Sequence, residues 1–253
     1  MPGLLLASIG TARRLPATLG LMPTQRTLDA APGSLSLVGA SATARVVANF
    51  AWQHLKAACT FRDQVVILEA KHSGQPFGAF FEEIRSYASA CLMSSVSSLE
   101  ALINELYIAH NCRLRQQFSD FEVQFWGKKG VERKPILDKY QLALDLLGAH
   151  RQSEHAGPYR DAWALIELRN ALIHYKPTWD PERQRTVDLI EVLDGQFSLS
   201  PFPDAGADFV SMKCMSAGCA RWAVDTVFSF IRQFDSRTAL DPGKMAGFWN
   251  LET

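Results

Sequence analysis

The chain has 253 residues, of which 47% are hydrophobic and 21% charged, as is typical of a globular protein with one large domain or two small ones. Lys and Arg total 26, as do Asp and Glu, so the formal charge is zero. This balance disfavours a dedicated high-affinity nucleic-acid binder, without excluding transient contact with RNA. No apolar run approaches the length of a membrane span, and we expect a cytoplasmic protein without membrane partners.

Residues 1–40 differ from the rest in being rich in Gly, Pro, Ala, Ser and Leu and in holding a single acid, Asp29. An Arg-containing, acid-poor start is weakly typical of a transit peptide. We favour instead an irregular N-terminal extension, with a short strand possible at residues 34–38.

Helical patterns begin at about residue 42 and continue to Lys71, where His72 to Pro76 break them. Residues 77–115 then predict one long helix or two in line. An apolar stripe and a row of small residues run side by side along it, and the small row would let another helix approach closely. The stripe is Leu92, Val96, Leu99, Ile103 and Leu106, and the small row is Ala88, Cys91, Ser95 and Ser98.

Residues 108–140 carry seven Lys or Arg against four Asp or Glu, a net charge of three positive. Lys128, Lys129 and Arg133 lie in its least regular part and are candidate contacts for phosphate or RNA. A solvated surface is the ordinary alternative for such a patch.

Further helices are predicted from Pro135 to Gly148, up to Tyr175, and over residues 217–234, while residues 180–193 are ambiguous. Alternation of Phe197 and Leu199 between Gly and Pro residues suggests a small β-hairpin near 196–212. The pattern predicts an all-α, antiparallel helical bundle of about five main helices. We assign residues 1–40 to the extension, 41–235 to the helical domain and 236–253 to a C-terminal tail.

The five cysteines are odd in number and irregular in spacing, which indicates free, buried thiols in a reducing compartment. Cys214 and Cys219 match no zinc signature. We therefore expect no metal and no cofactor.

One helix carries the residues most suggestive of chemistry. At about 100° per residue, Glu167, Asn170 and His174 share a polar stripe, whereas Arg169 falls on the opposite, apolar side. A guanidinium there needs a carboxylate, carbonyls, a wet cleft or an oligomer interface, because an unpaired buried charge is very costly.

Two structural explanations remain open for these residues. Arg169 could pair with an acid such as Glu100 or Glu105 and hold two helices in register. His174 could be an ordinary histidine at a helix C-terminus, where the helix dipole favours its protonated form. The same position at a helix C-terminus also suits a general acid or base. His174 therefore remains a candidate catalytic residue, and its position alone does not distinguish the structural from the catalytic interpretation.

The sequence Arg169-Asn170-x-x-x-His174 resembles the R-x(4–6)-H signature of the HEPN superfamily, which closes a late helix of a small all-α bundle. The segment from Ser97 to Leu106 (SSLEALINEL) resembles the earlier long helix of HEPN-like bacterial proteins. The resemblance covers roughly residues 80–235. It implies a metal-independent endoribonuclease whose Arg and His meet at a homodimer cleft.

Carried over by position, the resemblance implies that Arg169 stabilises the phosphate, that His174 moves protons, and that Asn170 orients the phosphate or His174. Glu100 and Asn104 would then position Arg169 or His174, although a plain helix-pairing role is the alternative. Some HEPN toxins carry a tyrosine two residues after the histidine. Here Lys176 stands at that place, which disfavours this form of toxin–antitoxin system.

Two other functions remain open beside the ribonuclease. The chain could be a non-catalytic HEPN-like module that binds a protein or a nucleotide, or a defence component that needs an antitoxin-like partner. Trp163, Trp179 and Trp222 could stack on bases, but packing in the core or at its rim is their more ordinary role.

Overall fold

The computed structural model describes residues 50–109, 112–176, 187–238 and 240, and these residues form an all-α fold without strands, which confirms the predicted fold class. The chain divides after Val46, and all described residues belong to the second unit. Within them, no helix combines the length and the apolar character needed to cross a membrane. The helices are α1 Phe50–Lys71, α2 Phe80–Ile108, α3 Arg113–Gln116, α4 Phe121–Trp126, η1 Val131–Arg133, α5 Ile136–Leu146, α6 Gly157–Ile173, α7 Val187–Leu193, η3 Phe209–Lys213 and α8 Ala217–Thr238.

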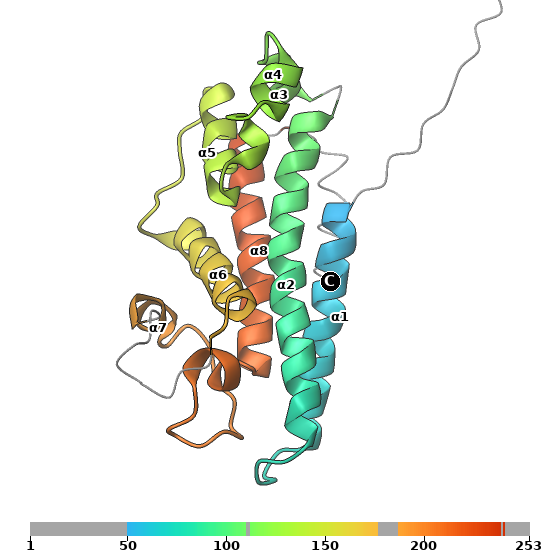
Figure 1. Ribbon diagram of the computed structural model, residues 1–253, viewed down its shortest axis with the longest axis vertical. Helices are drawn as coiled ribbons and strands as arrows, with labels where there is room; N and C mark the ends of the chain where they lie inside the picture. The colour runs from blue at the N-terminus through green and yellow to red at the C-terminus, as the bar shows by residue number, and fades with distance from the viewer. Residues whose placement is uncertain (1–49, 110–111, 177–186, 239, 241–253) are drawn as a thin grey trace, which may run out of the picture. The chain divides into compact units, whose positions relative to one another are not determined.

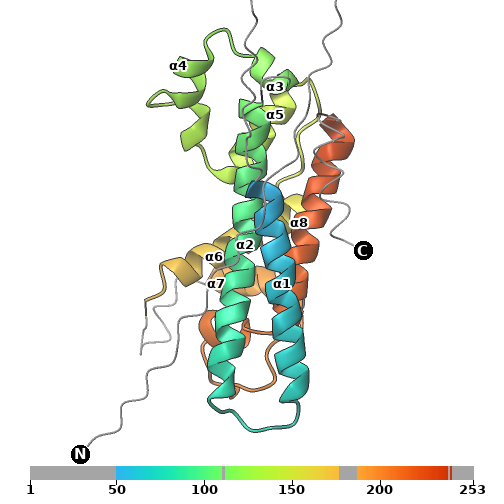
Figure 2. The same ribbon diagram turned by 90° about the vertical axis from the view of Figure 1, so that its right-hand side faces the viewer.

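Three long helices, α1, α2 and α8, form the body of the bundle (Figure 1). α1 runs antiparallel to α2 and α8, whereas α2 and α8 run in the same direction (Figures 1 and 2). The tight turn at residues 72–79 reverses the chain between α1 and α2. The return from α2 to α8 takes the longer route through α5, α6 and α7, which lets the two helices lie parallel.

The predicted stripe and small-residue row of α2 are both fully buried. The small row permits the close approach expected of it, since the Cys91 thiol lies 3.6 Å from the carbonyl oxygen of Ala220 on α8. The stripe belongs to one hydrophobic core, to which α1, α5, α6 and α8 also contribute buried residues.

Carboxylates from other helices cap two helix starts. Glu105 of α2 accepts hydrogen bonds from the backbone N–H groups of Phe50 and Ala51, at 2.8 and 2.9 Å. Glu69 of α1 accepts one from Ala217 N at 2.8 Å, at the start of α8. Each cap satisfies N–H groups that have no partner within their own helix.

α5 and α6 pack against α2 and α8 around Tyr140, which is fully buried. Its hydroxyl donates to the carbonyl oxygen of Leu99 at 2.8 Å. Its ring makes edge-to-face contacts with Phe230 and Phe234 of α8. This tyrosine joins three helices through one side chain.

The β-hairpin expected near 196–212 does not form, and that prediction is wrong. The segment consists of turns followed by η3, a single π-helical turn. Phe197 packs on Trp222 of α8, while Leu199 is 40% exposed, so the alternation reflects individual contacts of a loop. α8 continues past Asp235 to Thr238, three residues into the expected tail, and residues 1–40 lie outside the described part.

Residues 112–134, which contain α3, α4 and η1, form what we call the aromatic lobe (Figure 2). Phe125, fully buried, packs between Phe121 and Trp126, with ring centroids 4.9 and 4.6 Å away. Tyr107 near the C-terminal end of α2 contacts Phe118 and Phe125. The aromatic lobe is thereby attached to one end of α2.

Candidate functional site

The motif helix α6 begins with Gly157 and Pro158, which suit a first turn because proline needs no N–H partner there. The helix buries Tyr159, Ala162, Ala164, Leu165 and Leu168. Arg169 follows this buried face and is itself half-buried. Its Nε atom is buried without a hydrogen-bond partner, and within the described residues no ion pair joins it to a carboxylate.

The two acids considered as partners of Arg169 are engaged elsewhere. Glu105 caps the start of α1, and Glu100 lies 3.7 Å from Lys139. The pairing of Arg169 with either acid therefore does not occur in this structure. Within the described residues, the Nε atom of Arg169 therefore has no hydrogen-bond acceptor.

His174 is exposed and Asn170 half-buried at the C-terminal end of α6. His174 is the residue at which the helix ends, and its backbone N–H donates to Asn170 O at 2.9 Å. The Asn170 side-chain amide donates to Glu167 at 3.4 Å, so these two members of the predicted polar stripe lie on one face of α6. The imidazole of His174 is exposed. Five residues of helix place it about 140° around the axis from Arg169, and no hydrogen bond joins these two side chains in the described part.

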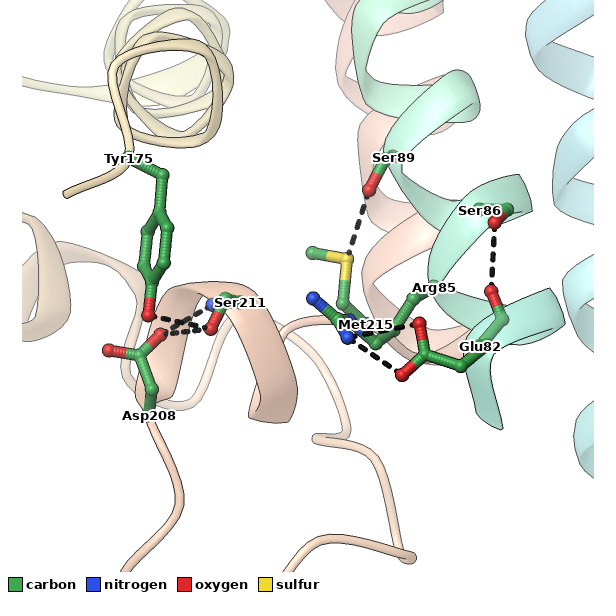
Figure 3. Close-up of polar contacts among 8 residues, drawn as sticks. All are labelled: Glu82, Arg85, Ser86, Ser89, Tyr175, Asp208, Ser211 and Met215. Atoms are coloured by element: carbon green, nitrogen blue, oxygen red, sulfur yellow. Dashed lines mark hydrogen bonds and ion pairs between the residues drawn. The ribbon is translucent and has the colours of Figure 1, made fainter. Parts of the chain in front are cut away.

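Tyr175, the next residue, anchors this end of α6 to η3 (Figure 3). Its hydroxyl is hydrogen-bonded to the Ser211 hydroxyl at 3.2 Å. The Asp208 carboxylate accepts from both the hydroxyl and the backbone N–H of Ser211, at 2.7 and 2.6 Å. The anchor fixes the backbone directly after His174. Sequence reasoning missed this, although Asp208-x-x-Ser211 has the spacing of a helix N-cap.

The N-terminal half of α2 contacts the segment that joins η3 to α8. The Ser89 hydroxyl contacts the sulfur of Met215 at 3.5 Å, and Arg85 pairs with Glu82 at 2.9 Å on the neighbouring turn (Figure 3). Met215 lies four residues after Ser211, between η3 and α8. The motif end of α6 is thus connected, through η3, to the start of α2.

Glu100 and Asn104 have a different partner from the one predicted. The Asn104 side-chain oxygen accepts a hydrogen bond from Lys139 Nζ at 3.0 Å, and Glu100 lies 3.7 Å from the same atom. Lys139 belongs to α5 and is 1% exposed. The pair therefore acts in helix pairing, which was the alternative considered for it, and no hydrogen bond connects it to Arg169 or His174 within the described residues.

Lys128, Lys129 and Arg133 are exposed in the aromatic lobe. The aromatic lobe contacts Tyr107, whereas the motif is connected through Met215 to Ser89. These two positions on α2 are separated by about 27 Å at 1.5 Å per residue. The structure does not bring the basic loop and the motif together.

An open pocket of about 470 Å³ lies at the other end of α6 and was not predicted. Its lining residues are Glu154, His155, Tyr159, Arg160 and Trp163. Trp163 is 38% exposed, which is consistent with a rim position, and Trp222 is half-buried against Phe197. Trp179 lies outside the described residues.

All five cysteines are free and buried, as predicted. Burial raises the pKa of the Cys91 thiol to about 12 and that of Cys219 well above its ordinary value. Such thiols are poor nucleophiles and metal ligands. In the described part of the chain, His, Cys, Asp and Glu side chains form no group of three that could hold a metal ion.

Comparison with known proteins gives no family. No family model matches the chain, and no curated protein and no solved structure matches it.

Proposed function

We propose that this chain is a HEPN-like protein that cleaves RNA without a metal ion, through Arg169, Asn170 and His174. The observation that carries the proposal is the Nε atom of Arg169, which is buried and unpartnered near the end of a helix that closes on an exposed histidine. A phosphate would supply the missing acceptor. Charge-assisted hydrogen bonds from a guanidinium to phosphate are among the stronger ones in proteins.

The chemistry follows from the two groups. The ribose 2′-oxygen attacks phosphorus and loses its proton, the bond from phosphorus to the 5′-oxygen breaks, and that oxygen takes up a proton. The products are a 2′,3′-cyclic phosphate and a free 5′-hydroxyl. His174 moves these protons and Arg169 stabilises the charge on the phosphate oxygens. Asn170, hydrogen-bonded to Glu167, orients the phosphate or His174.

The exposed face of α6 supports a homodimer as the active form. Trp163 is 38% and Ile173 50% exposed on this helix. Arg160 and Glu167, two turns apart on the same face, carry opposite charges. In an antiparallel pair of α6 helices centred on Trp163, Arg160 of each copy faces Glu167 of the other, as a two-fold interface requires. His174 then comes opposite the partner's pocket residues.

The test is RNA cleavage in EDTA by the purified chain. Arg169→Ala and His174→Ala should abolish cleavage while circular dichroism and the melting temperature stay close to wild type. Arg221→Ala and His150→Ala remove exposed residues of the same types outside α6 and should leave cleavage unchanged. Equal residual cleavage in all four variants would identify a contaminating nuclease.

Mixing the two inactive variants tests the dimer. In the antiparallel pair of α6 helices, Arg169 of one copy and His174 of the other lie about 24 Å apart along the helix axis, so this pairing predicts that mixing restores nothing. If the two copies pair differently and each site combines Arg169 of one with His174 of the other, a mixed dimer retains one intact site, and mixing restores about a quarter of wild-type activity. If each site lies within one copy, mixing restores nothing. The dimer itself is checked by sedimentation of Trp163→Glu, which should be monomeric.

A non-catalytic HEPN-like module is the second candidate. The separation of about 140° between Arg169 and His174, without a hydrogen bond between them, favours it. In that case Arg169→Ala lowers the melting temperature sharply and no cleavage is detected in the wild type.

A further inference from the structure

The aromatic lobe contains a tight turn that presents two lysines. Gly130 N donates to Gly127 O at 2.7 Å, so Lys128 and Lys129 occupy the two corner positions. A Cβ atom on Gly127 would lie 2.3 Å from Val123 O, and one on Gly130 would lie 2.2 Å from Phe125 O. Only glycine permits these approaches, and the turn therefore holds both exposed lysines at one fixed place.

An exposed indole lies directly before this turn. Trp126 packs edge-on against Phe125, with ring centroids 4.6 Å apart, yet 41% of the residue stays exposed. Val123, one turn earlier on α4, is 65% exposed. The contacts within the aromatic lobe already hold the Trp126 ring in place. A ligand that covers the exposed part of this ring therefore costs the side chain little further conformational entropy.

The charge of the aromatic lobe differs from that of the chain. Residues 112–134 hold six Lys or Arg and three Asp or Glu, while the whole chain is neutral. One of the acids, Asp120, is occupied as the N-cap of α4, where it accepts from Val123 N at 3.2 Å. Among the described residues, no ion pair joins Lys128, Lys129 or Arg133 to an acid.

We propose that the aromatic lobe binds single-stranded RNA, with Lys128 and Lys129 on neighbouring phosphates and Trp126 stacked on a base. Cations beside an exposed aromatic ring are what single strands require, because phosphates and unstacked bases alternate along them. A Gly-x-x-Gly turn is also the element with which KH domains hold a nucleotide backbone. The choice of RNA rests on the proposed function, whereas the binding does not require cleavage.

The position of the aromatic lobe sets the length of strand that could reach both sites. Tyr107, which contacts the aromatic lobe, and Ser89, which contacts Met215, lie about 27 Å apart along α2, the length of roughly eight nucleotides of a stacked strand at 3.4 Å each. A 12-nucleotide RNA is therefore long enough to contact the aromatic lobe and extend toward α6.

The experiment measures binding of a fluorescein-labelled 12-nucleotide oligouridine by fluorescence anisotropy, in full-length His174→Ala so that the probe stays intact. Adding Trp126→Ala should weaken binding about tenfold, since stacking contributes about 1–3 kcal/mol per base. Lys128→Ala/Lys129→Ala should weaken binding and lower the slope of log affinity against log salt by about 1.4, at about 0.7 per phosphate contact. Lys56→Ala/Lys71→Ala, which removes two exposed lysines of α1, should change neither quantity.

Trp126→Phe controls for loss of folding, because phenylalanine keeps the packing on Phe125. This variant should bind the RNA with an affinity between those of the wild type and Trp126→Ala. Absence of RNA binding, equal affinity in all variants, or equal loss in the α1 control would overturn the proposal. So would Trp126-dependent binding to phosphatidylserine vesicles without RNA binding, which would assign the surface to a membrane. RNA binding that persists in a wild-type chain unable to cleave RNA would refute the proposed function alone.

Discussion

The side-chain oxygen of Asn104 accepts a hydrogen bond from Lys139 Nζ at 3.0 Å and so joins the C-terminal half of α2 to α5. Lys139 is 1% exposed, whereas Glu100, its other polar neighbour, is 47% exposed and lies 3.7 Å away. Among the described residues, Asn104 is the closest polar partner of this buried ammonium. Losing it costs much more than losing a more distant, solvated partner. Asn104 is therefore the energetically important member of the pair.

This relationship predicts unequal effects of the two substitutions. Asn104→Leu should lower the free energy of unfolding by about 1.5–3 kcal/mol, the range for hydrogen bonds to charged groups. Glu100→Gln should lower it by less than about 1 kcal/mol, as for exposed ion pairs. Urea unfolding followed by circular dichroism measures both.

A double-mutant cycle provides the control. In a Lys139→Met background the charge beside Asn104 is removed, so Asn104→Leu should cost little. An equal cost in both backgrounds would show that Asn104 acts through its own packing, and that the hydrogen bond to Lys139 contributes nothing measurable.

The helices and their buried faces could be predicted because they depend on local periodicity. The stripe of α2 and its small-residue row repeat at helical spacing, and burial of one face of a helix follows from that spacing alone. The angular position of Arg169 was predicted for the same reason. The breaks at His72 and Pro135 follow from residues that end or begin helices.

Contacts between distant residues could not be predicted in this way. Glu105 caps a helix 54 residues earlier, and Glu69 caps one 148 residues later. Neither carboxylate carries a local signal of its partner. The hairpin was mispredicted because alternation at Phe197 and Leu199 cannot distinguish a strand from a loop whose side chains pack one by one. A helical wheel likewise shows that Arg169 needs a polar partner, but it cannot identify that partner.

A glycine at the start of α8 should resist replacement although alanine favours helices. Gly218→Ala gains at most about 1 kcal/mol of helix propensity, the value for a helix interior, but its Cβ would lie 2.4 Å from Ser198 O. At this distance the loop that contains Ser198 must move away from α8. Such overpacking typically lowers the free energy of unfolding by about 1–3 kcal/mol. We expect a lower melting temperature. Gly206→Ala, with no atom within 4 Å of its Cβ, should leave the melting temperature unchanged; equal melting of both variants would show that the loop yields freely.

The cysteines should resist modification in the folded protein. Burial raises the pKa of Cys91 to about 12, and only thiolates react at useful rates. Iodoacetamide at pH 8 should therefore label native protein slowly and guanidinium-unfolded protein at all five positions, as read by mass spectrometry. Cys59 should react first, because it is 8% exposed and Arg62 opposes the rise of its pKa. Rapid native labelling of Cys91 or Cys219 would show that α2 and α8 separate readily.

Glu69 should make the stability of the fold depend on pH. Burial raises its pKa, while the hydrogen bond from Ala217 N and the charge of Arg221 oppose the rise. Because the folded state then binds the proton more tightly than the unfolded state, stability falls as pH rises from about 4 through the raised pKa. Glu69→Gln keeps a hydrogen-bond acceptor for Ala217 N but cannot ionise. The free energy of unfolding of the wild type minus that of Glu69→Gln should therefore decrease as pH rises over this range. Glu69→Ala should lose about 1 kcal/mol as the cap disappears, and Glu83→Gln, on the exposed side of α2, should follow the wild type. A difference that instead grows with pH would mean that the ionised carboxylate gains more at the start of α8 than its burial costs.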